Sequence, residues 1–384
     1  MAWVETRPAG DADITWMRAG VSDDGSTILL GSGFGATTGR LWLSTNRGVS
    51  WTEQRPNGYD GGRLWMAVAV SGNGQVLIAG EFDTTGRIYR STNGGSSWAE
   101  IQPAGDADRR WLRAALDYDG SVIMAFRYQY YVYISSDSGV NWSYDAAIAS
   151  TNISIDCSND GAIMILGLNP GKMYISTNTG GSFSEVQPVV GDSNEEWNTS
   201  AINSDGSVLG CGSYYPSAAV LKPYYLSTNL GANWTAQDPP DSAWYDSAIA
   251  SNGLDIIASN YKRVYRTTNG GTIWTDANPD GSDTDRGWRV AQISQDGTLA
   301  IAAYSSGRVW IEDTGGTPAH KVADTITVVA NTPVIGYSSI HIPTAAIQIS
   351  AKAASIREGK ALSRTFPTIE AYRSFPVLLR EFPV

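Results

Sequence analysis

The stretch Ser44-Thr45-Asn46-Arg47-Gly48-Val49-Ser50-Trp51 decides the fold, because its pattern recurs along the chain. Copies of the form Ser/Thr-x-Asp/Asn-x-Gly-x-x-Trp/Phe occupy residues 91–98, 135–142, 176–183, 227–234 and 267–274. In such a stretch the Asx side chain accepts backbone N–H bonds within a turn, the glycine supplies a positive φ, and the aromatic ring packs beneath. The pattern predicts six structural turns, whose Asx residues are Asn46, Asn93, Asp137, Asn178, Asn229 and Asn269.

Two further registers accompany these turns. A glycine that ends a turn recurs at positions 25, 74, 120, 161, 206, 253 and 297, at intervals of 41 to 49 residues. Nine residues before each glycine stands Trp16, Trp65, Trp111, Asn152, Trp197, Trp244 or Trp288. An aromatic residue also begins the third strand of every unit, at Trp42, Tyr89, Tyr133, Tyr174, Tyr225, Tyr265 and Trp310. Four-stranded units of this length are typical of propeller blades, which stack around an axis. We predict an all-β, seven-bladed β-propeller over residues 1–316.

The seventh unit lacks a fourth strand led by an aromatic residue, and the N-terminus supplies one. The segment from Trp3 to Trp16 aligns with the segment from Trp98 to Trp111, and both Trp pairs are 13 residues apart. Trp3 therefore takes the fourth-strand position of the last blade. We expect the N-terminal strand to complete that blade and remove an open sheet edge.

The six turns resemble the Asp-box, or BNR, motif of sialidase-like propellers. The resemblance implies the propeller fold, and for a sialidase it implies three arginines, a Tyr nucleophile paired with Glu, and an acid. The usual Arg-Ile-Pro-like signature is absent, although Arg18, Arg113 and Arg289 lie on or beside inner strands. Because a shared fold does not transfer an activity, we expect a non-enzymatic protein and keep a sialidase-like glycosidase as the third hypothesis.

Composition excludes several function classes. A formal charge of −11 disfavours nucleic acid as a partner. The two histidines, His320 and His341, lie outside the ring, so no His-based zinc site or catalytic triad is expected there. We expect no cofactor and no metal, and we interpret Cys157 and Cys211 as buried thiols. The sequence contains no apolar run of about 18 residues, so we predict no membrane span. No export leader is visible either.

Ligand binding is expected on the face opposite the six turns. Connections between second and third strands carry Tyr128, Tyr130, Tyr131, Tyr214 and Tyr215, and an inter-blade loop carries Asp106 and Asp108. Tyrosines beside carboxylates can stack on sugar rings and accept their hydroxyl hydrogen bonds, so a glycan is one candidate ligand. The alternatives are a protein partner and a passive surface on which tyrosines fill blade edges and acids solvate loops.

Residues 317–384 differ in character and form a second predicted unit. They carry a formal +3, against −14 on residues 1–316, and they include strand-like alternation and three Phe-Pro pairs. Such a segment is too apolar for a free tail and too small for an ordinary core, which indicates an extended arm for anchoring or oligomerisation. The partner-binding residues expected in this arm are Phe366, Phe375 and Phe382.

The stretch from Ile342 to Lys352 resembles strand-rich segments of tailed-phage structural proteins. Together with the absence of a leader and the oppositely charged arm, this favours a virion-associated tail, fibre or capsid-surface protein. Such a protein would contact other virion proteins through residues 317–384 and display the propeller to a host glycan or protein. The rival hypothesis is an extracellular or cell-surface binding propeller. Seven-bladed propellers of this kind also include photosystem assembly factors, but those resemble exported proteins.

Overall fold

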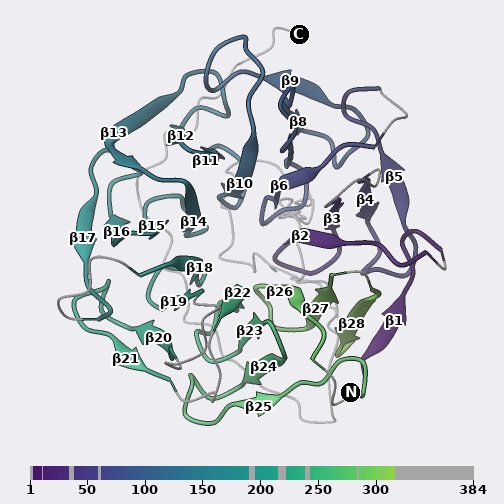
Figure 1. Ribbon diagram of the computed structural model, residues 1–384, viewed down its shortest axis with the longest axis vertical. Helices are drawn as coiled ribbons and strands as arrows, with labels where there is room; N and C mark the ends of the chain where they lie inside the picture. Colours follow the sequence, from purple (N-terminus) through teal and green to yellow (C-terminus); the bar gives the residue numbers. More distant parts are fainter. Residues whose placement is uncertain are drawn as a thin grey trace, which may run out of the picture. The chain divides into compact units, whose positions relative to one another are not determined.

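The computed structural model describes residues 3–10, 12–33, 39–58, 62–189, 195–214, 222–237, 243–282, 285–305 and 307–315. These residues form seven antiparallel four-stranded sheets arranged in a ring around one axis (Figure 1). The predicted seven-bladed β-propeller is therefore confirmed. The predicted C-terminal arm, with Phe366, Phe375 and Phe382, lies outside the described residues. No helix in the described ranges is long and apolar enough to cross a membrane.

Each blade runs from an inner to an outer strand. Blade 1 contains β2 (Trp16–Val21), β3 (Ile28–Ser32), β4 (Leu41–Ser44) and β5 (Thr52–Gln54). Blade 2 contains β6 (Trp65–Val70), β7 (Leu77–Glu81), β8 (Ile88–Ser91) and β9 (Ala99–Ile101). Blade 3 contains β10 (Trp111–Leu116), β11 (Ile123–Arg127), β12 (Tyr131–Ser135) and β13 (Ser143–Ala149). Blade 4 contains β14 (Asn152–Cys157), β15 (Met164–Asn169), β16 (Met173–Ser176) and β17 (Ser184–Val186).

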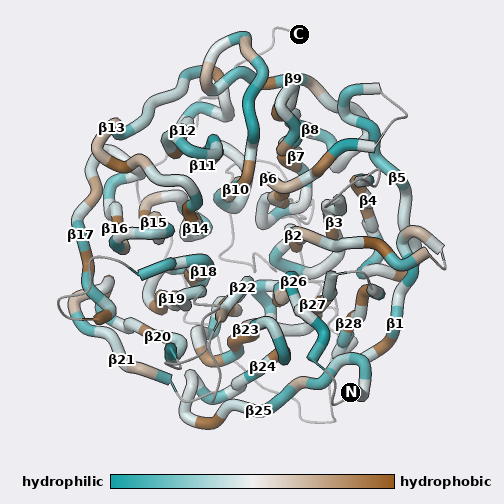
Figure 2. Tube along the Cα trace, in the orientation of Figure 1, coloured by the Kyte–Doolittle hydropathy of each residue, from teal (hydrophilic) through white to brown (hydrophobic). Residues whose placement is uncertain are grey.

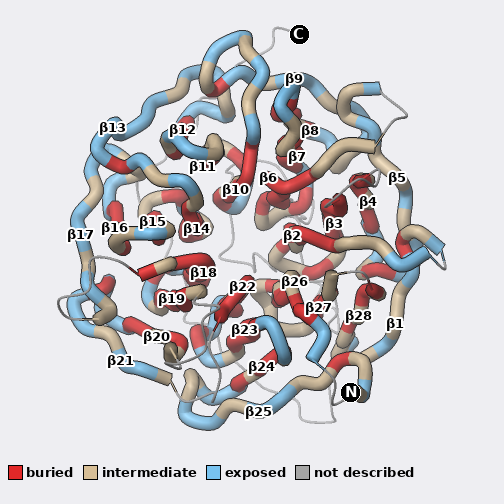
Figure 3. Tube along the Cα trace, viewed as in Figure 1, coloured by how far each residue is buried: buried red, intermediate tan, exposed pale blue. Residues whose placement is uncertain are grey.

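The remaining three blades complete the ring. Blade 5 contains β18 (Trp197–Ile202), β19 (Leu209–Ser213), β20 (Tyr224–Ser227) and β21 (Thr235–Ala236). Blade 6 contains β22 (Trp244–Ile249), β23 (Ile256–Asn260), β24 (Val264–Thr267) and β25 (Thr275–Asp276). Blade 7 contains β26 (Trp288–Ile293), β27 (Leu299–Tyr304), β28 (Val309–Asp313) and β1 (Val4–Thr6). Burial is concentrated on the inner and middle strands, whereas the outer strands are largely exposed (Figure 3).

The N-terminal strand closes the last blade, as predicted. Strand β1 pairs with β28 in the register Val4↔Ile311, Glu5↔Trp310 and Thr6↔Val309. Side chains from blade 1 reinforce this junction, because Arg47 forms an ion pair with Asp313 at 2.8 Å. That hydrogen-bonded pair raises the pKa of Arg47 and lowers the pKa of Asp313. The two ends of the ring are thus joined by backbone and side-chain bonds.

The six Asx turns join the third and fourth strands of blades 1 to 6. In the first turn, Ser44 Oγ donates to Asn46 Oδ1 at 3.0 Å, and Asn46 Oδ1 also accepts from Ser50 N at 2.9 Å. Gly48 has a φ of 79° and donates its N–H to Ser44 Oγ at 2.8 Å. The other five turns repeat the bond from the Ser or Thr hydroxyl to the Asx side chain, at Asn93, Asp137, Asn178, Asn229 and Asn269.

The first-strand tryptophans lie between neighbouring blades. Each belongs to a hydrophobic cluster with residues of the preceding blade: Trp65, for example, shares a cluster with Leu29 and Leu41 of blade 1. The indole N–H of Trp16 donates to Gly307 O of blade 7 at 3.0 Å, and that of Trp244 donates to Lys222 O of blade 5 at 3.0 Å. Hydrophobic residues accordingly line inner and middle strands such as β7 and β15 (Figure 2).

The tryptophans need space on the second strand of the preceding blade. A Cβ added at Gly80 would lie 2.7 Å from Trp111 Cβ, and one added at Gly167 would lie 2.7 Å from Trp197 Cβ. The residues at this second-strand position are small in the six blades that precede a tryptophan: Gly31, Gly80, Gly167, Gly212, Ser259 and Ala303. The remaining blade, blade 3, has Phe126 there, and the blade that follows it has Asn152 instead of tryptophan.

Candidate functional site

The predicted tyrosines of blade 3 form an exposed group at the hairpin between β11 and β12. The guanidinium of Arg127 lies over the ring of Tyr130, with Cζ 3.5 Å from the ring centroid. Tyr131 stacks on Tyr144 of β13, with centroids 4.7 Å apart and ring planes at 17°. Tyr130 is 44% exposed and Tyr144 is 53% exposed. We call Arg127, Tyr130, Tyr131 and Tyr144 the blade-3 aromatic surface.

The other predicted tyrosines lie elsewhere. Tyr128 packs edge-on against Phe82, which follows strand β7 of blade 2, with ring centroids 5.1 Å apart. Tyr128 is half-buried. Tyr214 packs against Tyr245, whose hydroxyl donates to the Tyr214 hydroxyl at 3.3 Å. Among the described residues, no ring contact joins Tyr214 to the blade-3 aromatic surface. Tyr215 lies outside the described residues.

Asp106 and Asp108 are engaged with an arginine. Arg87 Nη1 lies 2.7 Å from Asp106 Oδ1, and Arg87 Nε lies 2.9 Å from Asp108 Oδ1. Glu100 also contacts Arg87, at 3.0 Å. The hydrogen bond that Arg87 donates to Asp106 raises the pKa of Arg87 above its ordinary value. These two carboxylates therefore form a rim ion-pair cluster, distinct from the platform of tyrosines that the sequence suggested.

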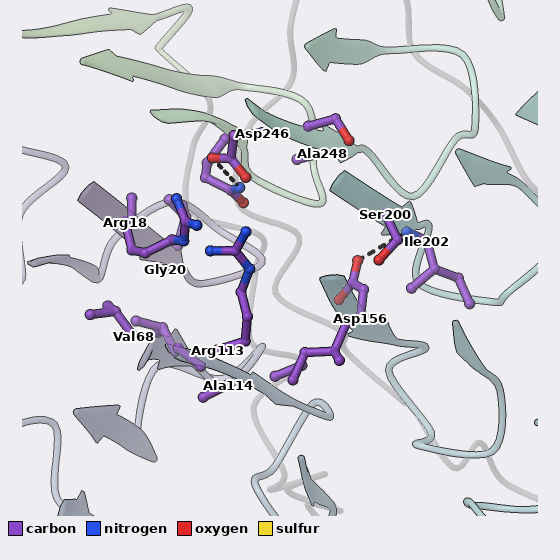
Figure 4. A pocket seen from close by; sticks show the side chains of 18 of the residues that line it. Arg18, Gly20, Val68, Arg113, Ala114, Asp156, Ser200, Ile202, Asp246 and Ala248 are labelled. Atoms are coloured by element: carbon purple, nitrogen blue, oxygen red, sulfur yellow. Dashed lines mark hydrogen bonds between the residues drawn. The ribbon is translucent and has the colours of Figure 1, made fainter. Parts of the chain in front are cut away.

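The axial cavity is not among the sites predicted from the sequence. This cavity has a volume of about 150 Å³ and is walled by the inner strands of the blades. Figure 4 shows its charged lining, in which Arg18 and Arg113 extend their guanidinium groups into the space. Asp156 and Asp246 line the same cavity from β14 and β22.

The two arginines have few hydrogen-bond partners. Arg113 is 8% exposed, and its Nη2 donates to Asn198 O across the ring at 3.3 Å. Arg18 Nη1 donates to Met17 O at 2.6 Å. Within the described residues, Arg113 Nη1 and Arg18 Nε have no hydrogen-bond acceptor. Burial lowers the pKa of Arg18 to about 10, against the attraction of Asp246, so it remains a cation at neutral pH.

The two acids connect neighbouring blades. Asp156 Oδ2 accepts from Ile202 N of blade 5 at 2.9 Å, and its Oδ1 accepts from Cys157 N at 2.9 Å. Asp246 Oδ2 accepts from Ala291 N and Gln292 Nε2 of blade 7 at 3.0 and 2.9 Å. Burial raises the pKa of Asp156 to about 7 and that of Asp246 to about 6. Both carboxyls therefore accept hydrogen bonds from protein donors. Each changes its charge at a pH near its raised pKa, about 7 for Asp156 and about 6 for Asp246.

One end of the cavity is spanned by polar side chains. Asn159 Nδ2 of blade 4 donates to Asp23 Oδ2 of blade 1 at 2.5 Å. The turns that carry these residues are joined to neighbouring blades by backbone bonds, such as Asp23 N to Gly72 O at 2.9 Å and Asn159 N to Ser204 O at 2.8 Å. Burial raises the pKa of Asp23 to about 6, even though the bond from Asn159 opposes this.

The sequence repeat contains a signal for the charged residues that line the axial cavity. Two residues after the tryptophan register the chain reads Arg18, Ala67, Arg113, Ser154, Thr199, Asp246 and Val290. Four residues after it the chain reads Gly20, Ala69, Ala115, Asp156, Ala201, Ala248 and Gln292. Charged residues at positions that are small or apolar in other blades mark the axial cavity. Among the described residues, no three His, Cys, Asp or Glu side chains converge as metal ligands would.

Comparison with known proteins identifies the fold and leaves the family open. No protein-family model matches the chain, and no curated protein matches it. Among solved structures, YCF48 from Cyanidioschyzon merolae superposes with a TM-score of 0.57 at 14% identity, covering 82% of this chain and 99% of that chain. A structure described as YCF48 bound to D1 peptide superposes with a TM-score of 0.57 at 13% identity, covering 81% and 96%. At these identities the likeness shows the propeller fold alone.

Proposed function

We propose that this chain is a non-catalytic binding protein that recognises a protein partner through the blade-3 aromatic surface. The observation that carries the proposal is the exposure of Tyr130 and Tyr144 beside Arg127 and the stacked ring of Tyr131. Tyrosine and arginine are enriched at protein interfaces, because they bury large areas while keeping polar contacts. A propeller of the same fold described as bound to a peptide supports a protein ligand.

The chemistry of the acids supports a non-catalytic role. A glycosidase needs one carboxyl to protonate the leaving group and another group to attack or to activate water. Asp106 and Asp108 hold Arg87, while Asp156 and Asp246 accept backbone N–H bonds between blades. We therefore expect no hydrolysis of a fluorogenic sialoside, and measurable turnover that is lost in Asp156→Asn or Asp246→Asn would overturn the non-catalytic part of the proposal.

Site-specific photocrosslinking tests the surface itself. A photoreactive amino acid at position 130, in protein produced in its native source, should give one discrete adduct that disappears when Tyr144 is changed to Ala. The same reagent at Tyr261 in blade 6, which is 55% exposed, is the matched control and should give none. Equal adducts from both positions would contradict the proposal. Glycan-array binding lost in Tyr130→Ala would replace the protein partner with a sugar.

The location of the protein is a further part of the proposal. We propose that residues 317–384 anchor the propeller in a virion, on the basis of their charge reversal and apolar pattern. Full-length protein should then cosediment with purified particles, whereas a chain ending at residue 316 should remain in the supernatant. Cosedimentation that survives the truncation would contradict anchoring through residues 317–384, and full-length protein that stays in the supernatant would favour the rival extracellular or cell-surface binding propeller.

A further inference from the structure

The axial cavity contains more hydrogen-bond donors than the protein satisfies. Arg113 Nη1 and Arg18 Nε have no acceptor among the described residues, and the hydroxyls of Ser154 and Ser200 have no partner there either. All four residues line the same cavity. The single bond from Arg113, to Asn198 O, is long at 3.3 Å. A buried cation with unsatisfied N–H groups destabilises the fold unless an acceptor reaches it.

The acids in the cavity do not supply that acceptor. Neither Arg18 nor Arg113 forms an ion pair within 4.0 Å in the described part of the chain. Asp156 instead accepts from Cys157 N and Ile202 N, and Asp246 accepts through Oδ2 from two donors of blade 7. Asp23, at the spanned end of the cavity, accepts from Asn159. The guanidinium groups therefore face a space that an external acceptor can fill.

We propose that the axial cavity binds one small free carboxylate between Arg18 and Arg113. A carboxylate matches the planar fork of a guanidinium and accepts from two groups at once. A cavity of 150 Å³ holds a molecule of about six non-hydrogen atoms, which admits acetate and simple hydroxy or keto acids. A single negative charge suits the cavity better than the second charge of sulfate or phosphate, because Asp156 and Asp246 share the space. This inference is independent of the proposed protein-binding function.

The hydroxyls of Ser154 and Ser200 complete the site. Both belong to inner strands, β14 and β18, and both line the cavity beside Asp156. A hydroxyl can donate to a carboxylate oxygen that the arginines leave free. The site thus consists of charge-assisted bonds from blades 1 and 3 and neutral bonds from blades 4 and 5.

Calorimetric titration of the full chain with sodium acetate tests the proposal, with sodium chloride, acetamide and sodium sulfate as parallel probes at constant ionic strength. Acetate should bind saturably at one site, and its Kd should rise at least tenfold in Arg113→Gln. The matched control, Arg55→Gln, removes an arginine that is 46% exposed and lies on the rim with Glu53, and should leave the Kd unchanged. Chloride and acetamide should not compete with acetate.

Milder variants keep the test decisive if Arg113→Gln does not fold. Arg18→Lys keeps the charge and removes the planar fork, and Ser200→Ala removes one neutral donor, so both should weaken acetate binding several-fold. Absence of saturable binding by the wild-type chain, or equal affinity in all variants, would overturn the proposal and leave water as the occupant. Sulfate that binds more tightly than acetate would overturn the choice of a carboxylate.

Discussion

The interface between blades 3 and 4 is filled by a large side chain from the preceding blade, whereas the other six interfaces are filled by one from the following blade. At six interfaces a buried tryptophan from the following blade fits over a small second-strand residue of the preceding one, as with Trp111 over Gly80. At the blade 3 to blade 4 interface the bulk comes from Phe126 of the preceding blade, which is fully buried, and the following blade presents Asn152.

Strand geometry changes together with this exchange. The first strand of each tryptophan blade carries a register shift just after the tryptophan, as between Trp65 and Ala67. Strand β14 pairs with β15 without a shift, from Asn152↔Asn169 to Cys157↔Met164. A bulge changes the direction in which neighbouring side chains point. The absence of a bulge from β14 therefore accompanies the different packing at this interface. The volume between neighbouring blades is therefore filled at every interface, but either of the two blades can supply the side chain that fills it.

The largest difference should come from truncating equivalent first-strand residues. Trp244→Ala should lower the free energy of unfolding by about 3–5 kcal/mol, because it empties a fully buried site and removes the indole bond to Lys222 O. Asn152→Ala should cost less than about 1 kcal/mol, since only the 3.2 Å bond from its Nδ2 to Asn198 is lost. Chemical denaturation of both variants measures the contrast, and equal costs would refute it.

The interface between blades 7 and 1 follows the common rule, and blade 7 itself is completed by the N-terminal strand β1. Deleting residues 1–7 removes the three pairs between β1 and β28 and the packing of Trp3 against the hydrophobic cluster between blades 6 and 7. The free energy of unfolding should fall by on the order of 3 kcal/mol, the typical cost of losing a packed aromatic residue. A thermal melt unchanged by the deletion would show that the ring does not depend on this closure.

Substitutions that replace the packing at the interface between blades 3 and 4 with that of the other interfaces should have strongly coupled effects on stability. Asn152→Trp should destabilise the chain by about 1–3 kcal/mol, because Phe126 already fills the space. Phe126→Gly should be destabilising alone, and the double variant should be more stable than the sum of the two costs predicts, by about 0.5–3 kcal/mol. Strictly additive costs in a double-mutant cycle would mean that the two side chains do not share one volume.

A pH-dependent difference concerns Asp156, which is an acid at a position where four other blades have Ala. Because burial raises its pKa from 3.8 to about 7, the folded chain retains a proton that the unfolded chain loses. The resulting stability is fully present below about pH 4 and is lost as pH rises through about 7. Asp156→Asn should therefore melt at a higher temperature than wild type at pH 8 and at nearly the same temperature at pH 4, because the wild-type carboxyl is charged only at the higher pH. The reverse trend would contradict the assignment.

The fold could be predicted because its determinants repeat at fixed offsets. The tryptophan, the third-strand aromatic and the Asx turn each act locally and recur, and Trp3 extended the same alignment to the N-terminus. The exchange of Trp for Asn152 was visible in the sequence. Its compensation at Phe126 was not, because it depends on which second-strand residue faces the next blade.

The candidate site could be predicted only in part. Tyr130 and Tyr131 can be predicted as aromatic residues of a hairpin, because that prediction needs only the strand boundaries. Their stacking partner Tyr144 belongs to an outer strand whose irregular pairing with β12 has no local signature. The axial residues come from blades far apart in sequence, so their proximity depends on the ring radius and side-chain direction. The number of charged residues in the sequence does not indicate which of them meet at the axis.

The closure of the last blade also determines when the ring can finish folding. During synthesis β1 leaves the ribosome first, whereas its partner β28 follows some 300 residues later. Blades 1 to 6 can pair their own strands as they emerge, but β1 must stay unpaired until nearly the whole propeller has been made. Ring completion is therefore the last step of assembly, and a chain interrupted before residue 309 would carry an incomplete seventh blade and an unmatched strand at its start.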